Sequence, residues 1–83
     1  MFKVTVTPEA TKQFKHLPIT EQTKIRKKLI SLENNPFSGK KLSGELSQLR
    51  SLKTWPYRII YYIDRNKQNI FITSILHRQG AYK

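Results

Sequence analysis

The C-terminal half of the chain contains three consecutive segments typical of β-strands, and the turns between them are short. The segments cover about residues 47–54, 57–64 and 68–76, where β-branched and aromatic residues mix with polar ones. Trp55-Pro56 separates the first two segments, and turn-forming residues at 64–67 separate the second and third. Because connections this short join antiparallel neighbours, we expect an antiparallel meander that the rest of the chain must cover.

The N-terminal half predicts one strand followed by two helices. Residues 2–6 are a β-branched run of alternating polarity, as in a strand. Thr7 is placed to cap a helix over about 8–16, because its hydroxyl can accept a backbone N–H of the first turn. Thr20 is the corresponding expected cap of a second helix, over about 20–34. Apolar residues three or four positions apart line one side of each helix.

These elements predict an α+β fold. Residues 34–45 are rich in Asn, Pro, Ser, Gly and Lys, so we expect a loop there without regular structure. The order is then β-α-α-β-β-β, a mostly antiparallel four-stranded sheet with a helical hairpin on one face. The 83 residues predict a single domain, 1–83, with a thin core, because so small a domain buries only about 60–65% of its unfolded surface.

Alternation along the second strand of the meander sorts its side chains onto two faces. One face carries Tyr57, Ile59, Tyr61 and Ile63, and the other carries Arg58, Ile60 and Tyr62. In the preceding strand, Lys53 shares a face with Ser51. If the Tyr-Ile-Tyr-Ile face is the core, Arg58 stands on the open face, where Lys53 from the adjacent strand can join it.

Charge and composition narrow the classes of partner. Sixteen Lys and Arg residues against five Asp and Glu give a formal net charge of +11, which attracts nucleic acid, an anionic membrane surface or an acidic protein. No segment reaches the ~18 apolar residues of a membrane span, and the N-terminus lacks a secretory signal, so we expect a cytoplasmic protein without a membrane partner. With no cysteine and only two histidines, no metal site and no cofactor are expected.

Each candidate functional residue also has a purely structural interpretation. Arg58 is either a phosphate contact or a solvated strand arginine that pairs with Asp64 or Glu45. Lys53 is either a second phosphate contact or an exposed strand lysine that discourages edge-to-edge aggregation.

The basic, aromatic end of the chain has the same two interpretations. The ring of His77 either exchanges protons or packs on the sheet, and Tyr82 either stacks on a nucleic-acid base or fills an apolar gap. Residue types alone leave these alternatives open.

Five segments, in this order along the chain, resemble the RelE/ParE superfamily of toxins from bacterial and archaeal type II toxin–antitoxin modules. They are VTVTPEATKQFKHLP, LISLENNPF, KKLSGEL, RSLKTWPYRIIYYID and ILHRQGAY, and they span nearly the whole sequence. For the RelE-like branch, the resemblance implies a metal-independent endoribonuclease that cuts mRNA in the ribosomal A site. In that reaction the ribose 2′-OH attacks its own 3′ phosphate.

The resemblance also implies roles for individual residues. The residues implied to be catalytic are Lys53, Arg58, His77, Arg78 and Tyr82, and those expected to bind RNA are Arg50, Lys40 and Lys41. Arg58 would contact the scissile phosphate and Tyr82 would stack on a base. Ser51 stands where many RelE-like proteins carry a second strand cation. Arg50 is one position away and should point to the other face unless a bulge redirects it.

The implied partners are the ribosome with its mRNA and a cognate antitoxin, an acidic and partly disordered protein that forms a heteromeric complex with the toxin. Two other functions remain possible at this point. ParE-like members of the superfamily inhibit DNA gyrase without RNA chemistry, and an inactive homologue would only bind nucleic acid. The combination of Arg58, His77-Arg78 and Tyr82 favours the nuclease, because a gyrase inhibitor has no evident need for it.

Overall fold

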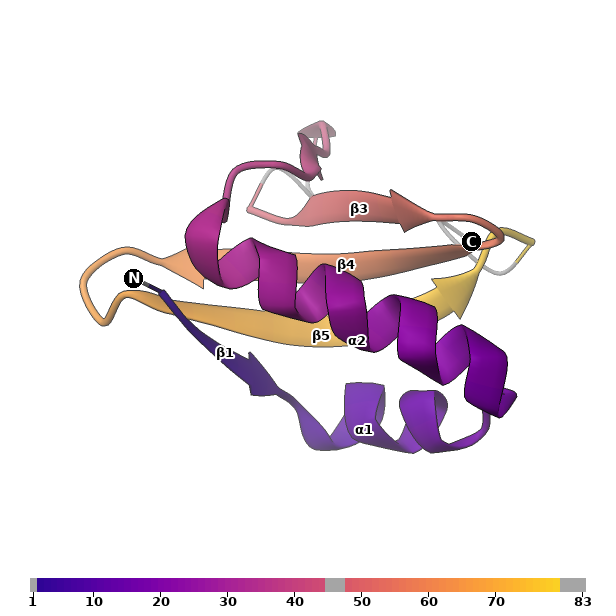
Figure 1. Ribbon diagram of the computed structural model, residues 1–83. Coiled ribbons are helices and arrows are strands. Elements are labelled where there is room, and N and C mark those ends of the chain that lie inside the picture. The colour runs from indigo at the N-terminus through magenta and orange to yellow at the C-terminus, as the bar shows by residue number, and fades with distance from the viewer. Residues whose placement is uncertain (1, 45–47, 80–83) are drawn as a thin grey trace.

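The computed structural model describes residues 2–44 and 48–79 and contains one five-stranded sheet with two helices on one face (Figure 1). The strands are β1 (Lys3–Val6), β2 (Lys40–Lys41), β3 (Arg50–Thr54), β4 (Tyr57–Asp64) and β5 (Asn69–His77). The helices, α1 (Pro8–Lys15) and α2 (Ile19–Asn34), follow β1 in the chain. The predicted α+β class and the helical hairpin on one face are confirmed.

The order across the sheet is β1-β5-β4-β3-β2. β3, β4 and β5 form the predicted antiparallel meander, whereas β1 pairs with β5 in parallel. The predicted count of four strands is wrong, because Lys40 and Lys41 pair with Ser51 and Arg50 as the short edge strand β2. Sequence patterns cannot identify this strand, because two residues are too few to show alternating polarity. Its pairing partner, β3, also comes only after an intervening loop.

The two helices begin in different ways. Thr7 caps α1 as predicted, since its hydroxyl oxygen accepts from the Ala10 N–H at 3.4 Å and its O–H donates to Ile72 O at 2.8 Å. The predicted Thr20 cap is wrong. α2 begins at Ile19, and the carbonyl of Pro18 accepts the first helical hydrogen bond, at 2.9 Å. No helix in the described residues is long and apolar enough to span a membrane.

The core lies between the helices and the face of the sheet that carries Ile59 and Tyr61. The fully buried side chains are Ala10, Ile25, Leu32, Ile59, Tyr61, Ile70 and Ile72, with Ile75 nearly so. Burying an isoleucine side chain contributes about 1.5–3 kcal/mol. The Tyr-Ile-Tyr-Ile face is therefore the core face, and Arg58 and Lys53 stand on the other, which we call the open face.

A bulge in β5 decides the orientation of the strand's end. Ile60 of β4 pairs with Ser74 and Tyr61 pairs with Ile72, so Thr73 is the extra residue. Its hydroxyl donates to the carbonyl of Ile60 at 3.1 Å. The extra residue shifts the alternation of β5, because a strand with period two cannot otherwise place residues 72 and 75 on the same face. Every side chain after the bulge therefore points to the face opposite the one that unbroken alternation predicts.

The hydroxyl of Tyr61 holds the loop after α2. It donates to Pro36 O and accepts from the N–H of Gly39, both at 2.8 Å, and the side chain is fully buried. A Cβ on residue 39 would lie 2.5 Å from that oxygen, so the close approach requires glycine. Burial raises the pKa of Tyr61 above the ordinary 10.0, although the Gly39 N–H, the charge of Arg50 and a hydrogen bond with Ser38 oppose the shift.

This raised pKa predicts a loss of stability in alkaline solution. The neutral phenol is the form that the fold favours, so its contribution is complete below about pH 10 and is lost as the pH rises through the folded-state pKa. We expect the difference in unfolding free energy between wild type and Tyr61→Phe to be constant up to about pH 10 and to narrow above it. Urea unfolding between about pH 8 and about pH 11 measures this difference, and a constant gap would contradict the assignment.

Candidate nucleic-acid interface

Two cations stand side by side on the open face. Lys53 of β3 pairs directly with Arg58 of β4, where side chains of opposed residues lie about 4.5–5.5 Å apart at Cβ. Lys53 is exposed and Arg58 is half-buried. Directly opposed like charges repel each other. A phosphate group that bridges the two cations would relieve this repulsion.

Trp55, in the turn between β3 and β4, brings a third cation to the same end of the sheet. Its ring is 57% exposed, with Lys53 Nζ 5.6 Å and Arg78 Cζ 5.0 Å from the ring centroid. The backbone N–H of Arg78 donates to Pro56 O at 2.8 Å, and Lys24 Nζ donates to Trp55 O at 3.1 Å. The sequence pattern predicts only a turn at Trp55. A sequence signal for a functional role does exist at this position. It is an aromatic residue two positions after a lysine, in a turn between two strands.

His77 lies on the opposite face from this cluster. It pairs with Tyr57, and the two rings meet edge to face with centroids 5.5 Å apart. Its Nδ1 accepts the N–H of Gln79 at 3.3 Å, which leaves Nε2 to carry the proton of the neutral ring. The bulge at Thr73 places His77 on this face, because it reverses the faces to which the later side chains of β5 point. The ring therefore packs on the sheet. Tyr82 lies outside the described residues.

The three residues expected to bind RNA lie at the β2 edge of the sheet but not on one face. Arg50 pairs with Tyr61, so it points to the helix side, as expected in the absence of a bulge between β3 and β4. Its Nη1 donates to Gly39 O at 2.8 Å. Lys40 pairs with Ser51 and faces the open side, whereas Lys41 pairs with Arg50. The structure brings Lys53, Arg58, Trp55 and Arg78 together and places Arg50 elsewhere.

No metal-binding arrangement is found in the part of the chain that the structure describes. Within it, no group of three or more His, Cys, Asp or Glu side chains is placed to hold a metal ion. The cluster itself offers cations, which bind and stabilise an oxyanion such as phosphate, and an indole ring that holds two of these cations.

Residues 4–82 match a protein family described as the ParE toxin of type II toxin–antitoxin systems, parDE. This chain belongs to the RelE/ParE superfamily of type II toxins. A comparison with curated proteins gave no match.

Solved structures of toxins are similar to this toxin. The RelBE2 toxin–antitoxin complex from Mycobacterium tuberculosis has a chain 26% identical to it, with a TM-score of 0.87 and with 93% of this chain and 98% of that chain covered. Isolated RelE toxin from E. coli is 22% identical, with a TM-score of 0.80 and coverage of 93% and 84%. The archaeal RelE–RelB complex from Pyrococcus horikoshii is 21% identical, with a TM-score of 0.78 and coverage of 96% and 98%.

Proposed function

We propose that this toxin is a ribosome-dependent endoribonuclease that cuts mRNA in the ribosomal A site and so inhibits translation in the cytoplasm. The observation that carries the proposal is the Lys53–Arg58 pair on the open face, with Trp55 and Arg78 beside it. Two cations over one exposed ring, with Arg58 directly across from one of them, suit a reaction that builds negative charge on a phosphate. The similarity in fold to RelE toxins supports the same conclusion.

In the proposed reaction, the ribose 2′-oxygen forms a bond to the adjacent phosphorus while the bond from phosphorus to the 5′-oxygen breaks. The products are a 2′,3′-cyclic phosphate and a 5′-OH. The 2′-OH proton passes to a base, and the 5′-oxygen receives a proton from an acid. Arg58 and Lys53 would stabilise the pentavalent transition state, in which the phosphate oxygens carry the most charge.

For proton transfer we propose Lys53, because its ammonium group shares a face with Arg58. A protonated Lys53 can donate to the leaving 5′-oxygen. His77 is the second proposal, because imidazole exchanges protons near neutral pH, but its ring lies against Tyr57 on the other face. A loss of cleavage in His77→Ala as large as that in Lys53→Ala would assign proton transfer to the histidine.

Primer extension on a defined mRNA in a purified translation system tests the proposal. We expect cuts at A-site codons in the presence of ribosomes and no cuts on the same mRNA without them. Folded toxin that leaves the mRNA intact in both samples would overturn the proposal.

The family description supports a second candidate, a ParE-like inhibitor of DNA gyrase. Such a toxin would act by binding a protein, and the cations of the open face would contact gyrase or its DNA. A supercoiling assay with purified gyrase separates the two functions. Inhibition of supercoiling by toxin that leaves translated mRNA intact would establish the gyrase function.

We also propose a cognate antitoxin as partner, since the similar structures include toxin–antitoxin complexes. The formal charge of +11 suits an acidic, partly disordered segment that folds onto the toxin and covers its cations. The affinity of such a complex falls as salt rises. Binding that is independent of salt would instead indicate an apolar interface.

Trp55→Ala should lower the rate of cleavage without unfolding the protein. The ring holds Lys53 and Arg78 near each other, and each exposed cation–π contact is worth about 0.5–1 kcal/mol. Losing both predicts a decrease of roughly 5- to 30-fold in kcat/KM on a model ribosome complex. Trp55→Phe should restore most of the activity, because it retains an aromatic face. Equal losses of cleavage in Trp55→Ala and Trp55→Phe would contradict this positioning role.

A further inference from the structure

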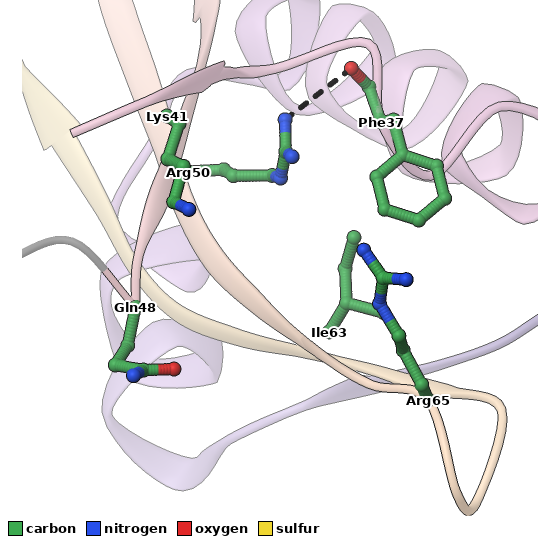
Figure 2. A pocket seen from close by; sticks show the side chains of 6 residues that line it. All are labelled: Phe37, Lys41, Gln48, Arg50, Ile63 and Arg65. Carbon is green, nitrogen blue, oxygen red and sulfur yellow. Dashed lines mark hydrogen bonds between the residues drawn. The ribbon is translucent and has the colours of Figure 1, made fainter.

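A hollow on the helix side of the sheet, next to β2, has three cations in its lining. Figure 2 shows the lining residues, which are Phe37, Lys41, Gln48, Arg50, Ile63 and Arg65. The volume is about 160 Å³, about tenfold more than the ~10–15 Å³ that one water needs by the same measure. An anion with several heavy atoms fits such a space.

The guanidinium groups of Arg50 and Arg65 both contact the ring of Phe37. Arg50 Cζ and Arg65 Cζ each lie 5.1 Å from its centroid, although Arg50 comes from β3 and Arg65 from the turn after β4. The ring is 44% exposed, so its main effect is to hold two like charges together and not to fill the core. Arginine stacks on aromatic faces while it keeps its N–H donors for phosphate or carboxylate.

Arg50 is already oriented for an anion. Its Nη1 donates to the carbonyl of Phe37 at 3.5 Å (Figure 2) and to that of Gly39 at 2.8 Å. Tyr61 in turn holds the same loop. A guanidinium has five N–H donors, so most of them remain for a ligand. Within residues 2–44 and 48–79, no carboxylate lies within ion-pair distance of Arg50, Arg65 or Lys41. The described lining therefore has an excess of positive charge.

We propose that this hollow is a second RNA contact, which binds a backbone phosphate of the nucleic acid whose scissile phosphate meets Lys53 and Arg58. The inference rests on the proposed function for the identity of the nucleic acid. β2 connects the two places, because Lys40 faces the open side with Ser51 while Lys41 faces the hollow with Arg50. A single-stranded RNA can contact these cations in turn as it passes around the short β2 edge of the sheet.

Fluorescence anisotropy with a labelled 2′-O-methyl RNA oligonucleotide, titrated at several salt concentrations, tests the inference. This RNA lacks the attacking hydroxyl, so binding is measured without cleavage. Each phosphate contact on a single strand contributes about 0.7 to the slope of log affinity against log salt. The Lys41→Gln/Arg65→Gln variant should lose the single phosphate contact of the hollow, which reduces the slope by about 0.7 and weakens binding by roughly 5-fold at about 0.1 M salt.

The control changes the net charge by the same amount elsewhere. Lys12 on α1 and Lys67 in the turn before β5 are exposed and lie outside the hollow, so Lys12→Gln/Lys67→Gln should leave the slope near that of the wild type. Equal slopes for the two double variants would overturn the inference, and so would wild type that does not bind the oligonucleotide. A loss of antitoxin affinity with unchanged RNA binding would overturn it too and assign the hollow to an acidic protein.

The failure of this inference can be distinguished from the failure of the nuclease proposal. If the toxin never cuts mRNA but Lys41→Gln/Arg65→Gln changes the salt slope, the second RNA contact is supported and the proposed reaction is refuted. If the toxin cuts mRNA but the double variant has the salt slope of the wild type, the reaction is supported and the second RNA contact is refuted.

Discussion

Arg58→Ala should abolish A-site cleavage of mRNA, with a decrease of about 10²–10³-fold in the rate of the chemical step. Arg58 stands directly across from Lys53 on the open face, where it would stabilise the charge of the transition state. Removing one preorganised donor to a developing oxyanion typically costs this much. Single-turnover cleavage on programmed ribosomes measures the effect apart from binding. Lysine at position 58 keeps the charge but loses the fork of donors, so Arg58→Lys should be intermediate.

Arg26→Ala is the matched control, because Arg26 is exposed on α2 and its guanidinium lies over Phe14, on the helix side. It should cleave like the wild type. Because Arg58 is half-buried, the thermal midpoint of Arg58→Ala must also be measured. A folded Arg58→Ala variant with wild-type cleavage would contradict the proposed role of Arg58 and place the nuclease site elsewhere on the toxin.

Tyr61→Phe should destabilise the fold by about 2–5 kcal/mol, which is large for a domain of this size. The change removes one hydroxyl and leaves Pro36 O and the Gly39 N–H, both 2.8 Å from it, without that partner. An unsatisfied buried polar group costs about 1–3 kcal/mol. The thermal midpoint should fall by roughly 10–40 °C.

Tyr62→Phe is the control for this substitution. Tyr62 is the next residue along β4, is 38% exposed and stacks on Phe71, so loss of its hydroxyl should change stability by less than about 0.5 kcal/mol. Equal midpoints for the two variants would show that the Tyr61 hydroxyl does not hold the loop. Since that loop carries Phe37 and Gly39, Tyr61→Phe should also weaken the RNA contact proposed for the hollow.

Much of the fold follows from short-range patterns in the sequence. Alternation of polarity locates β4 correctly at 57–64 and sorts its side chains onto two faces, which is enough to put Arg58 and Lys53 on the same face. Thr7 can be recognised as a cap because capping depends on a few adjacent residues. The same approach fails at Thr20, because the helix has already begun after Pro18.

Tertiary structure alone decided the features that depend on pairing between distant segments. β2 exists because two lysines meet β3, and the bulge at Thr73 exists because β5 must place both Ile72 and Ile75 in the core. That bulge moves His77 away from Arg58, which no local pattern indicates. Likewise, Phe37, Arg50 and Arg65 meet only when three separate segments pack together. The sequence by itself therefore determined every helix and strand except β2, and it placed Lys53 and Arg58 on one face. Long-range strand register decided which side chains meet, because the sum of buried contacts selects it and no single segment encodes it.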